Sequence, residues 1–121
     1  MIDIDRLNDI KIENYIFIIY YIIITISLYA NKVETEYLIT DNKEIIEKYR
    51  KLLFVIFGTA FLVYLYYTIS NYDDYIEDNN PNSKRLNGLT FLASFLVLIS
   101  GTIYLYVIYE DKDVNIELAF N

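Results

Sequence analysis

The sequence predicts an all-α integral membrane protein with three transmembrane helices. Residues 15–30, 52–70 and 89–109 form three runs, of 16, 19 and 21 residues, that contain no charged side chain. The 10 basic and 17 acidic side chains all lie outside these runs. About 20 helical residues cross the hydrocarbon core of a bilayer, where a charge costs about 2.5–3.5 kcal/mol. A bilayer therefore explains this segregation better than water does.

The chain has 121 residues, which is enough for one structural unit and leaves no room for a separate soluble domain. We expect residues 1–121 to form a single three-helix transmembrane unit. Its expected parts are spans at about 12–33, 50–72 and 87–109, polar connections over 34–49 and 73–86, and an acidic tail over 110–121.

The first apolar run is the shortest and is rich in isoleucine. Isoleucine also suits a strand, but a lone strand in lipid leaves its backbone groups unpaired, whereas a helix pairs them internally. Ile4, Leu7 and Ile10 recur near helical spacing, which predicts an amphipathic helix that lies at the interface and leads into the span. Four residues at steps of four make an aromatic and hydroxyl stripe that we expect to face neighbouring helices: Phe17, Tyr21, Thr25 and Tyr29.

The second helix is expected to begin before its apolar run. Asp41 and Glu44 have the spacing of a capping box, and apolar and charged residues between Asn42 and Lys51 fall largely on opposite sides of a helix. A helix from Asn42 to Tyr72 would be about 46 Å long. This second helix would therefore extend beyond the membrane.

The third helix is expected to start at or near Pro81, because proline suits the first helical position and Asn80 is a cap residue. One face of this helix carries small residues, which let helices approach closely in lipid. We expect that face, together with Gly58 in the second run, to form a helix-packing interface within the chain or with another subunit. The predicted interface residues are Thr90, Ala93, Ser94, Val97, Ser100, Gly101, Tyr104 and Gly58.

The basic residues give a weak bias in orientation. Six lie in the first connection and the tail, and four lie in the amino-terminal segment and the second connection. Because basic residues favour the cytoplasmic side, we expect an external amino end and a cytoplasmic carboxyl end. Tyrosines near the ends of the runs, such as Tyr15, Tyr64 and Tyr109, fit the aromatic belts of a bilayer.

Composition argues against several classes of function. The chain has no cysteine and no histidine, so it lacks a thiolate and the side chain best suited to proton transfer near neutral pH. Its net charge of −7 disfavours nucleic acid as a partner. The acidic group of Asp73, Asp74, Glu77 and Asp78 lacks the ligand spacing of a calcium loop. We expect neither catalysis, nor a cofactor, nor a bound metal.

These features predict a small structural or accessory membrane protein that packs helices against itself or against a larger membrane complex, in contact with the lipid bilayer. The small size, three spans and charged ends resemble the architecture of phage holins, and this resemblance would imply oligomers that permeabilise a membrane. The tail here is acidic, whereas holins commonly end in a basic segment. Pore formation therefore stays an alternative, as does an immunity or regulatory protein that binds a membrane target.

Overall fold

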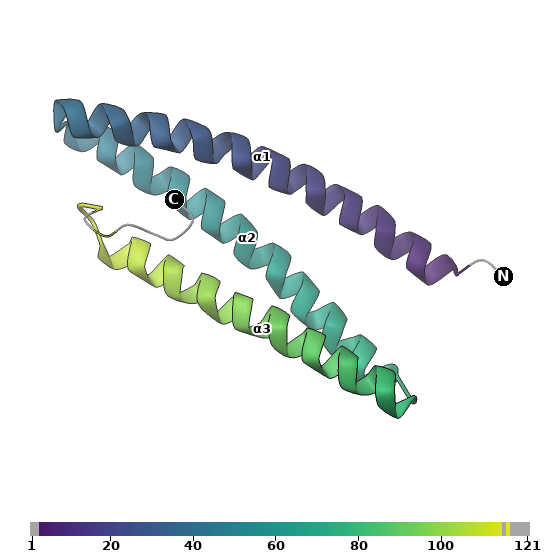
Figure 1. Cartoon of the computed structure of the whole chain (residues 1–121). Helices are drawn as coiled ribbons and strands as arrows, with labels where there is room; N and C mark the ends of the chain where they lie inside the picture. Colours follow the sequence, from purple (N-terminus) through teal and green to yellow (C-terminus); the bar gives the residue numbers. More distant parts are fainter. Residues whose placement is uncertain (1–2, 115, 117–121) are drawn as a thin grey trace.

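Three long helices make up the computed structural model, which describes residues 3–114 and 116 (Figure 1). Helix α1 is Ile4–Thr40, α2 is Lys43–Glu77 and α3 is Pro81–Glu110. They run up, down and up, with short connections. Helix α2 is central, since α1 and α3 each pack against it and, among the described residues, the backbones of α1 and α3 do not approach each other closely. The three-helix, all-α part of the prediction is confirmed.

Asx residues begin all three helices. The carboxylate of Asp3 accepts from the backbone N–H of Arg6, and the amide oxygens of Asn42 and Asn80 accept from N–H groups two residues ahead. Such caps satisfy backbone donors that have no partner within the helix. The predicted start of the third helix at Pro81 is confirmed.

The predicted capping role of Asp41 is wrong. Asp41 has a left-handed backbone with φ of 54°, and its N–H donates to the carbonyl of Tyr37, which closes α1. The neighbouring Asn42 caps α2 instead. Asp41 can end α1 in this way because aspartate and asparagine are the non-glycine residues that most readily tolerate the left-handed region.

The helices are longer than the predicted spans. At the standard rise, the 37 residues of α1 measure about 56 Å and the 35 residues of α2 about 52 Å. The polar segment 34–49 is helical apart from Asp41 and Asn42. Helix α1 begins at Ile4, so the helix predicted over Ile4, Leu7 and Ile10 is continuous with the helix of the first apolar run. Each helix contains a stretch long and apolar enough to cross a membrane, with mean hydropathies of 1.7, 2.1 and 2.2.

The buried core lies toward one end of the molecule, where the carboxyl half of α1 meets the start of α2. Tyr49 and Leu53 are its largest fully buried side chains, and Ala30 and Val33 of α1 pack against them. Ile108 joins the same cluster from α3. Contact with all three helices makes this end the anchored end of the fold.

Much apolar surface remains uncovered. The chain exposes 8914 Å², whereas a soluble monomer of 14.4 kDa exposes about 6,800 Å². Side chains such as Ile22, Leu62 and Ile103 are more than half exposed on α1, α2 and α3 respectively. Large exposed apolar surfaces mark contact with a membrane or another protein.

Most of the aromatic stripe on α1 does not pack against α2, contrary to the prediction. Phe17 is 60% exposed and Tyr21 is 74% exposed, whereas the buried residues of α1 are Ile16, Ala30 and Val33. At the end of the stripe, however, Tyr29 lies against α2, with the Lys48 ammonium 5.0 Å from the centre of its ring. The span of α1 is apolar on nearly every side. Spacing alone therefore could not decide which face would pack.

Candidate helix-packing site

A groove of about 210 Å³ separates the middle parts of α2 and α3. Half of the residues that line it have aromatic side chains, and the other half are smaller residues. The α3 side consists of predicted interface residues, and the full lining is Phe57, Ala60, Phe61, Tyr64, Val97, Ser100, Gly101 and Tyr104. Four of the eight predicted residues are thus brought together at one site.

The other predicted residues lie elsewhere. Ser94 is buried against α2, where its hydroxyl oxygen accepts a hydrogen bond of 3.1 Å from the amide of Asn71. Thr90 and Ala93 are exposed, and the hydroxyl of Thr90 donates to the carbonyl of Leu86 in its own helix. Gly58 is half-buried on α2 and does not line the groove.

The glycines of this region are not used for close packing inside the chain. A Cβ atom added at Gly58 or Gly101 would meet no neighbouring atom within 4 Å. Gly88 differs, because a Cβ there would lie 3.1 Å from the ring of Tyr75. Small residues at positions 58 and 101 therefore leave space that α1, α2 and α3 do not fill.

Two aromatic pairs join α2 to α3, one within the lining of the groove and one nearer the connection between the two helices. The ring of Phe57 lies 5.3 Å from that of Tyr104, and the ring of Tyr72 lies 5.3 Å from that of Phe91. These tilted pairs have the centroid separations that aromatic side chains prefer. The positions of the tyrosines in the sequence predict interfacial anchors but not these pairs, because the aromatic content of the two runs does not reveal which rings meet.

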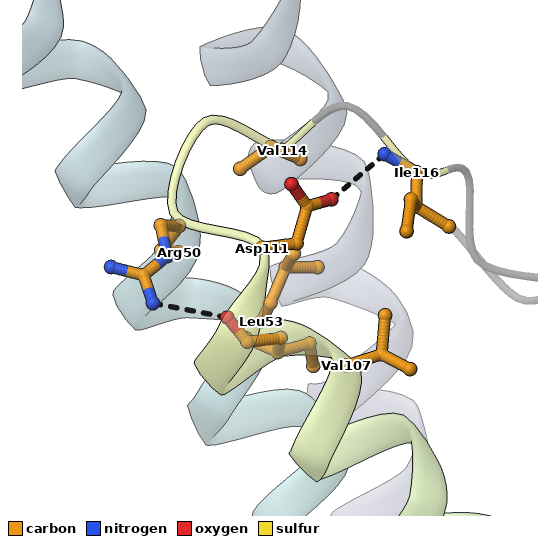
Figure 2. Close-up of a pocket in the computed structure, with 7 residues that line it drawn as sticks. Arg50, Leu53, Val107, Asp111, Val114 and Ile116 are labelled. Carbon is orange, nitrogen blue, oxygen red and sulfur yellow. Dashed lines mark hydrogen bonds between the residues drawn. The ribbon is translucent and has the colours of Figure 1, made fainter.

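At the anchored end, Arg50 holds the end of α3 (Figure 2). Its Nη2 group donates to the carbonyl oxygens of Ile108 at 3.0 Å and of Tyr109 at 3.2 Å. A cation that binds the last carbonyls of a helix satisfies free acceptors and complements the helix dipole. Beyond the helix, the backbone N–H of Ile116 donates to the carboxylate of Asp111 at 2.8 Å.

The groove has an apolar and aromatic lining. Within residues 3–114 and 116, no three Asp, Glu, Cys or His residues are grouped so that they could hold a metal ion. The groove is lined by hydrocarbon, aromatic rings and the hydroxyls of Ser100, Tyr64 and Tyr104. Surfaces of this kind bind helices or apolar side chains in lipid.

Comparisons of this chain with protein-family models, with curated proteins and with solved structures found no match.

Proposed function

We propose that this chain is a multi-pass membrane protein that works as a small structural or accessory subunit. In this proposal the groove between α2 and α3 receives a helix of a second copy or of a larger membrane complex. The observation that carries the proposal is the unfilled space at Gly101 and Ser100, at the middle of a helix that is apolar on its other sides.

Two features support membrane insertion. The three helices are sufficiently long and apolar, and their exposed side chains are hydrophobic on several faces at once. A soluble bundle would instead turn a polar face to water. At about 52 Å, α2 exceeds the thickness of the hydrocarbon core, so we propose that its first turns, which contain Glu44 and Glu47, stand outside the membrane.

The groove suits a helix because packing in lipid depends on close contact. Lipid tails are as apolar as leucine, so helices gain little from hydrophobic burial and instead need small residues at the point of approach. Ser100 and Gly101 supply that point, and the rings of Phe61 and Tyr104 give it raised sides.

Gly101→Leu tests the groove directly. The added side chain would occupy the groove, so we expect the purified variant to lose its oligomer or its copurifying subunit in mild detergent, as measured by light scattering and mass spectrometry. Thr102→Leu is the matched control, since Thr102 is an exposed neighbour on the same helix and does not line the groove. A wild-type chain that is monomeric and without a partner in both detergent and lipid nanodiscs would refute the proposal.

Pore formation is not favoured by a specific observation. The hydroxyls of Thr25, Thr68 and Thr102 donate to carbonyl oxygens four residues earlier in their own helices. Dye leakage from vesicles that contain the purified chain would nevertheless replace the accessory role with a permeabilising one.

A further inference from the structure

A polar cleft of about 140 Å³ lies between the amino-terminal end of α1 and the carboxyl-terminal end of α2, opposite the anchored end. It is distinct from the α2–α3 groove. Carboxylates, hydroxyls and one guanidinium line it: Arg6, Asp9, Glu13, Tyr66, Tyr67, Ser70, Asn71 and Asp74. Arg6 and Asp9 precede the predicted first span and Asp74 follows the predicted second span, whereas the lining residues from 66 to 71 belong to the last turns of that second span.

The charges in this cleft are unbalanced. Arg6 forms an ion pair with Glu13 of its own helix at 3.2 Å, and it is the cleft's one cation. Asp9 on α1 and Asp74 on α2 therefore face the cleft as like charges. The titratable and charged groups around Asp74 are Arg6, Asp9 and Glu13 on α1 and Asp73, Tyr66 and Tyr67 on α2, and no residue of α3 lines the cleft.

The amino end of α1 is weakly held. Residues 4–15 contain no buried side chain, and the first buried residue of α1 is Ile16. From Ile16 onward α1 packs against α2: the side chain of Tyr20 forms a hydrogen bond with Tyr64, and the core contacts follow around Ala30 and Val33. Figure 1 shows the two helices meeting at that end and diverging toward the amino terminus. Residues 4–15 therefore form a lever, by which we mean a helical segment that is attached to the rest of the fold only at its carboxyl-terminal end, next to Ile16.

We propose that this end of α1 is a pH-dependent lever, held open by repulsion between ionised Asp9 and Asp74 and closed onto α2 when Asp74 takes up a proton. Opening widens the cleft and uncovers the tyrosines of α2, and closing covers them. This inference does not depend on the proposed packing role of the α2–α3 groove.

The electrostatics agree with the geometry. Asp74 is an exposed residue, and partial desolvation of its carboxyl, followed by the nearby charges of Asp9 and Asp73, raises its pKa above the ordinary value of 3.8. The ionised form of Asp74 is disfavoured when Asp9 lies near it, that is, in the closed cleft. Linkage therefore requires proton uptake by Asp74 to favour the closed cleft and proton release to favour the open one.

Spin-label distances can follow the lever, because the chain has no native cysteine to remove. Labels at Asn8→Cys and Ile76→Cys, both exposed sites, report on the cleft. We expect the mean distance between them to lengthen as the pH rises from about 4 to about 8, because a carboxyl group with a raised pKa loses its proton above the ordinary carboxyl pKa. Labels at Ile39→Cys and Glu47→Cys, near the anchored end, should keep a constant distance.

Variants that replace an aspartate by the uncharged asparagine test whether Asp9 and Asp74 cause the pH response. Asp74→Asn and Asp9→Asn should each give the short distance at every pH, because either change removes the repulsion. Glu77→Gln is the matched control, an exposed acidic residue of α2 outside the cleft, and it should keep the wild-type response. A wild-type distance that ignores pH, a response that persists in both Asp variants, or a response abolished by Glu77→Gln would overturn the proposal.

Discussion

At the scale of single residues, Tyr49 has the largest expected effect on stability. It is fully buried between α1 and α2, and its hydroxyl forms a hydrogen bond with Glu34. Tyr49→Ala would leave a cavity at the anchored end, and we expect it to destabilise the fold by about 3 kcal/mol or more. Tyr49→Phe removes only the hydrogen bond and should cost about 1 kcal/mol.

Thermal unfolding in detergent would measure both changes. Tyr106→Ala serves as the control, because Tyr106 is 63% exposed on α3, and it should change the stability by less than about 1 kcal/mol. Equal losses for Tyr49→Ala and Tyr106→Ala would contradict the placement of the core.

Asp78 governs the connection between α2 and α3 and adds a pH dependence. The hydroxyl of Ser83 donates to its carboxylate, as do the backbone N–H of Asn80 at 3.0 Å and the amide of Asn87 at 2.9 Å. These bonds favour the ionised form and hold the pKa of Asp78 below its ordinary value of 3.8, with the Ser83 bond the largest cause.

A lowered folded-state pKa means that the stabilising contribution of Asp78 is present above the ordinary carboxyl pKa and is lost as the pH falls through the lowered one. We therefore expect the melting temperature of the wild type to drop at the acidic end of a pH series. Asp78→Asn should flatten that part of the curve. An identical acid limb in wild type and variant would show that the connection does not titrate.

At the scale of elements, the glycines separate packing within the chain from packing between chains. Alanine is favoured over glycine inside a helix by about 0.5–1 kcal/mol. Gly58→Ala and Gly101→Ala meet no neighbour, so each should raise the melting temperature of the isolated chain. Gly88→Ala would press on the ring of Tyr75 and should gain less or lose stability. Melting curves of dilute, monomeric protein would rank the three variants, and a destabilised Gly101→Ala would mean that the groove is closed.

The same scale shows what the sequence could predict. The start of α3 followed from Asn80 and Pro81, because cap and first-turn preferences act locally. The N-cap of α2 at Asn42 instead of Asp41 could not be predicted, since aspartate and asparagine both suit an N-cap and both tolerate the left-handed backbone that ends α1.

The side on which α1 packs, and the bond between Asn71 and Ser94, depend on contacts between helices. Four-residue spacing locates a face on its own helix but does not identify its partner. The predicted interface on α3 was therefore partly assembled, at Val97, Ser100, Gly101 and Tyr104, while Thr90 and Ala93 face outward.

At the scale of the whole molecule, the proposed membrane insertion predicts that three crossings place the two ends of the chain on opposite sides. Asn8→Cys and Asp113→Cys lie at opposite ends of the up-down-up bundle, beyond the apolar stretches of α1 and α3. A membrane-impermeant maleimide should label Asn8→Cys in intact cells and Asp113→Cys only after lysis, since the basic residues of the first connection favour a cytoplasmic carboxyl end.

The reverse pattern would invert the orientation and keep three crossings, whereas labelling of both sites from one side would exclude an odd number of crossings.

Extraction experiments test whether the chain resides in a membrane. If lipid covers the exposed side chains, the chain should stay with membranes through an alkaline wash and leave them only in detergent, because about 20 apolar residues per helix hold it there. A monodisperse chain in detergent-free buffer would instead require that its own copies cover the apolar side chains that one chain exposes, and it would remove the membrane assignment.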